Sequence, residues 1–432
     1  MAMTAVRIAW DQLGPVEVTR DEADISRPLG SLEHLFWLMD QNRSVHFAMT
    51  AQIAGRASPY HWREALDRLQ WRHPILSVRI DGKPGSIPRF RQVDPAPIPL
   101  RIVEGDPKVD WESEVGVELA MPFDHSRAPF IRAVLIQGSR DTAFILVAHH
   151  SVADGLSLAY AIRDTVSTIC GESLARLSPL PSQEEILAAR AQRITPLHAA
   201  KQQNDVSAGN PGIYRPLDNA RPTVKGLRLE PVLTERIRDR ARWEDTTVHG
   251  ALSAAIVIAG RQVFADWQKI PIRIMSPINI RPMLDVGESC GVFVSAATAT
   301  FEGTITGFWE LARNAKIAIA TGQTRDRVAA LQKRLGEVVG KGAEVVVAAE
   351  FAATAFVHEA MLTNLGVLDF DKQLGPLKLE EVWGPAVLDG MVGEHTIGVA
   401  TVNGSICLTH TSHTPSEGFL PTMRSVLVKA CQ

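Results

Sequence analysis

The chain has 432 residues, of which 45% are hydrophobic and 22% are charged, and this is the composition of an ordinary globular protein. Its length predicts two domains of roughly 200 residues, each large enough to bury a core. The net charge of −3 gives no sign of nucleic-acid binding, and no dense run of Lys and Arg marks a membrane surface site.

The cysteines and the apolar stretches point to a reduced, cytoplasmic protein. The four cysteines are Cys170, Cys290, Cys407 and Cys431. None forms a C-x-x-C pair, so the spacing indicates neither a zinc site nor a disulfide framework, and we expect no metal. The start of the chain lacks the apolar core of a signal peptide. The longest apolar stretches, 250–260 and 345–357, are too short to span a membrane, and we interpret them as buried helices.

The first part of the chain, residues 1–175, is predicted to form one lobe of helices and strands. Apolar residues at helical spacing predict helices, and short apolar runs bounded by turn residues predict strands. The expected elements are helices at 31–38, 58–71, 111–120 and 156–170, and strands at 76–80, 90–93, 130–137 and 144–148.

Residues 176–222 differ in composition, being polar and punctuated by prolines, with one helix expected at 183–193. We interpret this stretch as the connection between two lobes. The second lobe is expected over 223–432. Its predicted helices are 247–264, 304–323, 326–339 and 420–431, and its predicted strands are 224–229, 272–280, 396–402 and 405–409. The last two strands are joined at Asn403-Gly404, a strong hairpin signal. The order of elements in the two parts is broadly alike.

One short motif carries most of the chemical information. It is His149-His150-Ser151-Val152-Ala153-Asp154-Gly155, placed between an apolar strand and a helix. Alternation along an extended segment directs the two histidine side chains to opposite sides, so that only one of them faces a given cavity. A neutral imidazole can take a proton at neutral pH and suits a general base acting on a hydroxyl, amine or thiol.

A purely structural interpretation of the same motif is also open. The two histidines would then be buried and satisfied by backbone carbonyls, and Asp154 would cap the following helix. Gly155 would be a plain loop glycine, or would leave room beside His150. Three further histidines near the end of the chain lie among polar residues, and we expect them at the surface. These are His395, His410 and His413.

The motif resembles the signature of the acyltransferase superfamily that includes chloramphenicol acetyltransferase, plant alcohol acyltransferases, nonribosomal peptide condensation domains and the polyketide-associated acyltransferases of actinobacteria. Five weaker matches to family segments follow in the expected order. They are Arg72-His73-Pro74 with Leu76, Pro122-Phe123-Asp124 with Pro129 and Arg132, Pro277-Ile278-Asn279-Ile280-Arg281-Pro282, Gly291-Val292-Phe293-Val294 and Thr363-Asn364-Leu365-Gly366. The resemblance covers residues from about 28 to about 410 and is most like the freestanding polyketide-associated enzymes.

The resemblance implies an α/β (α+β) fold of two chloramphenicol acetyltransferase-like lobes, each a mixed sheet with flanking helices. An active-site tunnel would run between them, and segments of the second lobe would cross over to hold the lobes together. By resemblance, His150 is the general base, His149 faces away from the substrate, and Asp154 pairs with Arg281 to shape the site.

Other site residues are less well indicated. Asn364 and Trp383 are candidates for the tunnel lining or the oxyanion region, although an aromatic residue is more often part of a core. Ser157 and Thr363 are further candidates for stabilising the oxyanion. The family's Asp-Phe-Gly-Trp-Gly segment has its nearest equivalent at Val382-Trp383-Gly384-Pro385, without the leading acid and phenylalanine. This departure counts against a peptide-forming condensation domain and favours a freestanding ester-forming enzyme.

The resemblance therefore predicts an acyltransferase that moves an acyl group from a thioester to a hydroxyl of a lipid, polyketide or other natural-product acceptor. The co-substrate would be acyl-coenzyme A or an acylated phosphopantetheine on a carrier protein, with no tightly bound cofactor. The resemblance implies direct attack of the hydroxyl on the thioester, without an acyl-enzyme. Two alternatives stay open: an amide-forming condensation-type enzyme, and a non-catalytic carrier-protein docking module. A fold of this kind can work as a monomer, so the oligomeric state is open.

Overall fold

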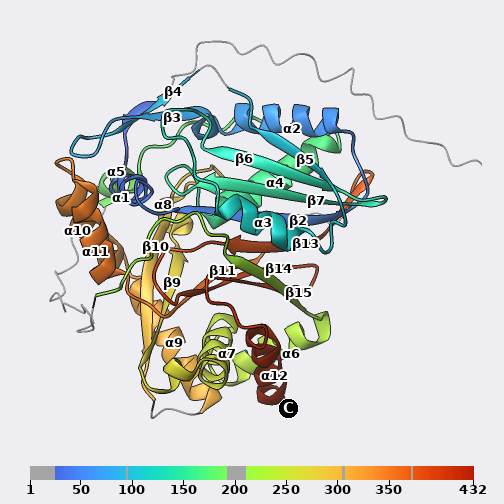
Figure 1. The fold of residues 1–432 in the computed structure, drawn as a ribbon, viewed down its shortest axis with the longest axis vertical. Coiled ribbons are helices and arrows are strands. Elements are labelled where there is room, and N and C mark those ends of the chain that lie inside the picture. Colours follow the sequence, from blue (N-terminus) through green and yellow to red (C-terminus); the bar gives the residue numbers. More distant parts are fainter. Residues whose placement is uncertain (1–24, 94–95, 192–210, 304–306, 371–372) are drawn as a thin grey trace, which may run out of the picture.

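The structure is a computed structural model that describes residues 25–93, 96–191, 211–303, 307–370 and 373–432 (Figure 1). Two six-stranded mixed sheets form the centre of the molecule, and a small three-stranded sheet lies beside the first of them. Helices cover the outer faces of the two large sheets at opposite ends of the molecule (Figure 1). This arrangement confirms the predicted α/β fold with two lobes.

The first large sheet carries the histidine motif. Its strand order is β12-β13-β2-β7-β6-β5. In chain order the bounds are β2 (His46–Ala54), β5 (Leu100–Glu104), β6 (Ile131–Gln137), β7 (Asp141–His149), β12 (Gln373–Leu374) and β13 (Leu377–Ala386). Only β5 and β6 pair in parallel; the other neighbours are antiparallel. The small sheet consists of β1 (Ser26–Pro28), β4 (Arg89–Gln92) and β3 (Val78–Asp81).

Helices lie on both faces of the first sheet. Helices α2 (Pro59–Arg72) and α4 (Gly155–Ile169) pack on one face, where Trp62 and Leu158 share a buried core with Leu146 of β7. On the other face, α3 (Trp111–Leu119) packs against Val147, the next residue of the strand. Both sides of β7 are therefore buried, as the uninterrupted apolar sequence of this strand predicts.

The second large sheet has the order β10-β9-β11-β14-β15-β8. In chain order the bounds are β8 (Thr223–Leu229), β9 (Ile272–Asn279), β10 (Val294–Phe301), β11 (Ala360–Val367), β14 (His395–Val402) and β15 (Ser405–Ser412). A second hydrophobic core joins it to helices that lie at the far end of the molecule in Figure 1. These helices are α6 (Pro231–Trp243), α7 (Val248–Val263), α9 (Phe308–Gly322) and α12 (Phe419–Ala430).

The remaining helices lie around the junction of the lobes. They are α1 (Ser31–Met39), α5 (Gln183–Ala191), α8 (Arg281–Leu284), α10 (Arg325–Val339) and α11 (Val345–Ala355). Leu335 of α10 and Phe351 of α11 belong to the same core as Leu35 of α1, although these helices come from opposite ends of the chain. No helix in the described part of the chain is both long enough and apolar enough to cross a membrane.

One segment of the second half of the chain joins the sheet of the first lobe. Strand β13 pairs antiparallel with β2, with Trp383 opposite Thr50, and so adds residues 377–386 to the sheet of the first lobe. This segment lies within the expected second lobe, 223–432, and its hydrogen bonds join it to the first sheet. A crossover of this kind is what the resemblance implies.

Several elements differ from the sequence-based expectation. Strand β2 was not predicted: eight of its nine residues are buried, so most positions on both faces hold apolar or small side chains and no alternating pattern results. The helix at 231–243 was not predicted either. His395 and His410 are buried rather than exposed: their rings meet at an Nδ1–Nε2 distance of 3.1 Å inside the second lobe, so their expected surface position was wrong.

Candidate active site

His150 lies directly after β7, where the backbone leaves the first sheet. Its N–H donates to the carbonyl of Val45 at 3.3 Å. The imidazole is stacked between two rings, with centroids 4.7 Å from Phe36 and 4.3 Å from Phe47. His150 as a whole is only partly buried, whereas His149 is fully buried. Two aromatic faces thus fix the plane of the His150 ring.

The hydrogen bonds of His150 leave one nitrogen available. Nδ1 lies 3.2 Å from the carbonyl oxygen of Ala153, so Nδ1 carries the proton and donates. Nε2 then holds a lone pair. Burial, with a smaller contribution from His149, lowers the pKa of His150 to about 4, so the ring is neutral at pH 7. A neutral imidazole with a free Nε2 is equipped to accept a proton.

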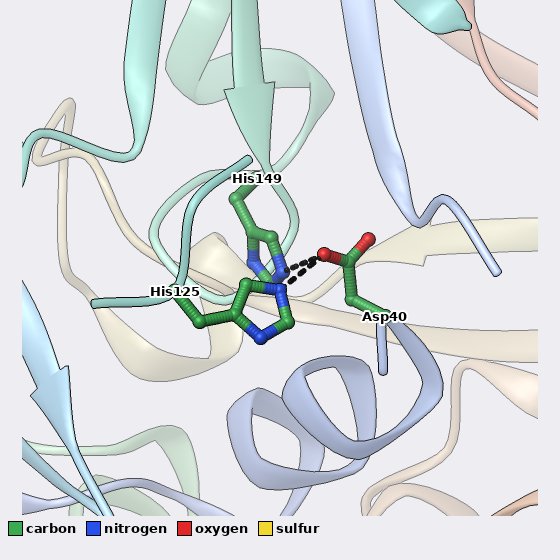
Figure 2. A group of neighbouring side chains, drawn as sticks. All are labelled: Asp40, His125 and His149. Carbon is green, nitrogen blue, oxygen red and sulfur yellow. Dashed lines mark hydrogen bonds and ion pairs between the residues drawn. The ribbon is translucent and has the colours of Figure 1, made fainter. Parts of the chain in front are cut away.

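His149 points away from His150, as strand alternation predicts. Its ring contacts Phe130 and His125, and its Nε2 lies 3.3 Å from Oδ2 of Asp40 (Figure 2). Its Nδ1 accepts the N–H of Ser151 at 3.0 Å. His149 therefore accepts a hydrogen bond at Nδ1 and faces a carboxylate at Nε2, which gives it a structural place.

Asp40, His125 and His149 converge on one point, a grouping that sequence spacing did not reveal (Figure 2). Their nearest ligand atoms all lie within 4.8 Å of one another, close enough to consider a metal ion. Nε2 of His125 lies 2.5 Å from Oδ2 of Asp40, and its Nδ1 faces the amide nitrogen of Gln41 at 2.6 Å.

The tautomers do not fit a metal centre. A neutral histidine that binds a metal through Nε2 donates its Nδ1–H to an acceptor. Here Nδ1 of His125 and Nδ1 of His149 both face donors, the Gln41 amide and the Ser151 N–H. Both Nε2 atoms therefore carry hydrogen: that of His125 donates to Oδ2 of Asp40, and that of His149 faces the same oxygen at 3.3 Å, which favours a carboxylate held by two histidines over a cation site. Despite burial, the electrostatic effect of His149, followed by the hydrogen bond from His125, holds the pKa of Asp40 well below its usual range.

Asp40 also holds the backbone around His150. Its Oδ1 accepts the N–H of Val45 at 2.8 Å, and the carbonyl of Val45 accepts the N–H of His150. Its Oδ2 meets the His149 ring. The Asp40 carboxylate therefore contacts both neighbours of the His150 backbone: Val45, which accepts the His150 N–H, and the His149 ring.

Asp154 is both a helix cap and an ion-pair partner. Its Oδ1 accepts the N–H of Ser157 at 2.8 Å, capping α4, and Nη2 of Arg281 donates to the same oxygen at 2.8 Å. Its Oδ2 accepts the N–H of Phe293 at 3.0 Å. The two sequence interpretations of Asp154 are thus compatible, and the carboxylate joins the first lobe to two segments of the second.

Ser157 belongs to this network rather than to an open site. It is fully buried, and its hydroxyl lies 2.8 Å from Nη2 of Arg281 and 2.9 Å from both Oδ1 of Asp154 and the carbonyl of Gly291. The Gly291 N–H also donates to it at 3.1 Å. With these partners the hydroxyl is committed to structure, which removes the support for Ser157 as an oxyanion donor.

Gly155 is the first residue of α4, not a loop residue, and it makes room for the second lobe rather than for His150. A Cβ at this position would lie 2.8 Å from Cδ2 of Leu365 and 2.9 Å from Cγ of Pro385. Glycine is therefore required where β11 and β13 approach the motif.

The remaining candidates lie in different surroundings. Trp383 is buried and stacks on Trp111 of α3 at 5.1 Å, in the core between α3 and β8, so it is a core residue rather than a lining residue. Thr363 is buried in β11, and Oδ1 of Asn364 accepts the N–H of Gly366 at 2.9 Å. The roles of these two residues and the tunnel stay predictions.

Parts of the chain are similar in sequence to known proteins. Residues 218–388 match the family described as "Phthiocerol/phthiodiolone dimycocerosyl transferase C-terminus". Tyrocidine synthase 3 of Brevibacillus parabrevis is 25% identical over 289 residues, and surfactin synthase subunit 2 of Bacillus subtilis is 24% identical over 316 residues. The aligned regions cover 62% and 67% of this chain but only 4% and 8% of those proteins.

Solved structures of the same shape extend over nearly the whole chain. Polyketide synthase associated protein 5 from Mycobacterium tuberculosis matches with a TM-score of 0.63 at 18% identity, covering 95% of this chain and 99% of that one. The first condensation domain of the CDA synthetase matches with a TM-score of 0.68 at 16% identity, covering 94% and 97%. The chain thus has the fold of the acyltransferase and condensation-domain superfamily, and its residues 218–388 resemble one family of that superfamily in sequence.

The sequence revealed some residues of this site and not others. The motif gave His149, His150, Asp154 and Gly155 as a unit. The aromatic rings on either side of His150 and the carboxylate of Asp40 carried no motif signal. The one sequence signal for Asp40 is its place directly after the first predicted helix.

Proposed function

We propose that the protein is an O-acyltransferase that uses His150 to move an acyl group from a thioester to an alcohol. Nε2 of His150 takes the proton of the hydroxyl as the oxygen attacks the thioester carbonyl. The resulting tetrahedral oxyanion collapses, breaking the carbon–sulfur bond, and the departing thiolate receives the proton from His150. The observation that carries this proposal is the neutral, ring-stacked His150 with a free Nε2 beside the junction of the lobes.

The relatives support transfer chemistry of this class. The matched family is named for a dimycocerosyl transferase. A trichothecene 15-O-acetyltransferase from Fusarium sporotrichioides shares the fold with a TM-score of 0.67 at 12% identity, covering 94% of each chain. The starter condensation domain of rhizomide synthetase was solved in complex with C8-CoA and Leu-SNAC. We therefore expect an acyl-coenzyme A or carrier-bound acyl thioester as donor.

An amide-forming reaction is the second candidate, because the matched relatives include large synthases such as tyrocidine synthase 3, and condensation domains share the fold. The same general base would serve an amine. A matched pair of acceptors, one alcohol and one amine of the same skeleton, separates the two. Faster thiol release with the amine than with the alcohol would indicate that the enzyme forms amides rather than esters.

The decisive experiment compares wild type with His150→Ala in thiol release from a panel of acyl-coenzyme A donors and pooled alcohols. Carrier-bound acyl thioesters are tried in parallel. We expect at least a ~100-fold loss of turnover in the variant. His61→Ala, on α2, is the matched control and should keep full activity. Undiminished turnover in folded His150→Ala would place the base elsewhere, and tight carrier binding without turnover in wild type would support the docking-module alternative.

A further inference from the structure

A hairpin turn of the first lobe meets a loop of the second lobe at the surface. Residues 82–88 connect β3 to β4, and residues 340–344 connect α10 to α11. The N–H of Gly85 donates to the carbonyl of Ala343 at 2.9 Å. The two backbones touch closely, since a Cβ on Gly342 would lie 2.8 Å from the carbonyl oxygen of Gly85. Two segments that are far apart in the chain are therefore joined into one surface.

Large aliphatic side chains are exposed on both sides of this contact. Ile87 of the hairpin turn is 54% exposed, and Val346 and Val347, in the first turn of α11, are 59% and 42% exposed. Each lies two to four residues from the joined backbones, so the three side chains gather within about 20 Å of one another. They form a group rather than the scattered single apolar residues of an ordinary surface.

Two lysines accompany the aliphatic side chains. Lys83 lies in the hairpin turn and Lys341 in the loop of the second lobe, and both are exposed. Neither forms an ion pair within the described part of the chain. Glu344 is the only acidic residue in the two segments 82–88 and 340–344. The contact itself therefore carries a net positive charge.

Arginines extend this positive charge along β3 and β4. Arg79 lies opposite Arg91, and Asp81 lies opposite Arg89, so all four side chains share one face of the small sheet. Nε of Arg79 and Nε of Arg91 both reach the carboxylate of Asp81, at 2.7 and 2.8 Å. Arg89 donates from Nη2 to the carbonyl of Ser26 at 3.0 Å. This face thus holds three arginines and one carboxylate.

We propose that this surface binds an anionic lipid bilayer. The aliphatic side chains would enter the headgroup layer while the lysines and arginines meet the lipid phosphates, a combination of apolar burial and charge attraction that holds proteins at such surfaces. We call this surface the hairpin patch. It consists of Arg79, Lys83, Ile87, Arg89, Arg91, Lys341, Val346 and Val347.

Charge complementarity selects the partner. The patch holds five cations, and Asp81 and Glu344 are the only acids in the segments that form it, so it fits a negatively charged surface. The cations come from two lobes and form no dense run in the sequence, so only the folded chain presents them together. A fluid headgroup layer can contact the spread cations and the aliphatic side chains at the same time.

The hairpin patch is connected to the proposed site through one packed core. The loop 340–344 joins α10 to α11, and Leu335 and Phe351 of these helices share a core with Leu35 of α1. The next residue of α1, Phe36, stacks on His150. Binding to a bilayer does not itself depend on the proposed function.

The first experiment measures sedimentation of the full chain with lipid vesicles and needs no turnover. Vesicles of about equal parts of phosphatidylcholine and phosphatidylglycerol are compared with vesicles of phosphatidylcholine alone. We expect binding to the mixed vesicles that is at least about 10-fold weaker for phosphatidylcholine alone. Raising the salt to about 1 M should weaken it by a similar factor, because charges are then screened within about 3 Å.

The second experiment repeats the measurement with variants of exposed residues. Lys83→Gln combined with Lys341→Gln should bind the mixed vesicles at least about 10-fold more weakly than wild type. Ile87→Ser combined with Val346→Ser should bind at least about 5-fold more weakly. The matched control combines Arg242→Gln on α6 with Ile317→Ser on α9, and it should bind like wild type. Both control residues are exposed and belong to helices at the far end of the molecule (Figure 1).

Each outcome supports or overturns the inference. Weaker binding in both patch variants, with the control unchanged, supports it. No binding by wild type, or equal binding by all folded variants, overturns it. If wild type instead forms a dimer by light scattering that dissociates in the patch variants, and no vesicles are bound, the patch is a contact between two copies of the chain and the bilayer is excluded. Thiol release measured without vesicles tests His150 separately, so the two proposals can fail independently.

Discussion

His150 is made a neutral base by its immediate surroundings. Two aromatic rings remove water from its faces, and the Ala153 carbonyl fixes the tautomer. Its basicity is therefore low, but its proton-accepting form is present at every physiological pH. Such a base contributes to catalysis through its fixed position rather than through a high pKa.

The pH dependence of turnover follows from this pKa. Because the pKa of His150 is lowered to about 4, the ring is unprotonated above about pH 5 and becomes protonated only below it. We expect kcat/KM to stay level from pH 8 to pH 5 and to fall toward pH 4. Initial rates after brief dilution into each buffer, with recovery of activity on return to pH 7 as the control, check this. An acid limb centred near the ordinary histidine value of about 6.5 would contradict it.

Asp40 is predicted to position His150 without touching substrate. In Asp40→Asn the amide can still accept from Val45, but its NH₂ faces the two Nε2–H donors of His125 and His149. We expect kcat to fall between about 10-fold and 100-fold with KM nearly unchanged, since misplacement of a reacting group costs rate more than binding.

Asp164→Asn is the matched control for this prediction. Asp164 is also buried and accepts from a histidine, with Nε2 of His73 at 3.0 Å, but it lies away from the His150 loop. The Asp164→Asn variant should have a lower melting temperature than wild type and an unchanged kcat. Equal kcat values in wild type and Asp40→Asn would show that the carboxylate contributes to stability alone.

At the scale of elements, the start of α4 is the point where the lobes are joined. Asp154 caps the helix, pairs with Arg281 of α8 and accepts the Phe293 N–H before β10. Gly155 lets Leu365 and Pro385 approach. The motif that carries the base therefore also sets the relative position of the two sheets.

Asp154→Ala is expected to lower the free energy of unfolding by about 3–5 kcal/mol, because it removes a cap and leaves the buried Arg281 without its anion. Asp154→Ala combined with Arg281→Met should recover part of that loss, since no unpaired charge is then buried. Urea unfolding of the two variants measures the difference. A double variant no more stable than Asp154→Ala would contradict the ion-pair explanation.

At the scale of the whole molecule, buried histidines dominate the response to acid. Burial lowers the pKa of His34, His46, His150, His249 and His395 to about 4 and that of His410 to about 3. In the unfolded chain these groups titrate near about 6.5. Between these values the unfolded state binds more protons than the folded state, so stability falls as the pH falls.

We therefore expect the free energy of unfolding to decrease from pH 6.5 to pH 5, by about 1.4 kcal/mol per pH unit for each proton that the unfolded chain takes up in excess. Glu394, with its pKa raised to about 8, acts in the opposite direction because the folded state holds its proton; it offsets part of the decrease. Urea unfolding at pH 7, 6 and 5 measures the slope. Constant or rising stability toward pH 5 would contradict this prediction.

The sequence by itself determined the local features of this protein. Helix periodicity, the buried strand β7, the alternation that separates His149 from His150 and the cap at Asp154 all depend on neighbouring residues. The family resemblance added the two-lobed fold and the partner of Asp154. The local features depend on residues that are close together in the sequence, so the sequence pattern predicts them.

Only the tertiary structure decided the rest, because the contacts join residues that are distant in the chain and follow no period. Asp40 and His125 meet His149 across three separate segments (Figure 2). Trp383 enters the first sheet from the second half and packs on Trp111, which made it a core residue. His395 and His410 became buried, and the turn 82–88 came to meet the loop 340–344, once the strands and lobes around them had assembled.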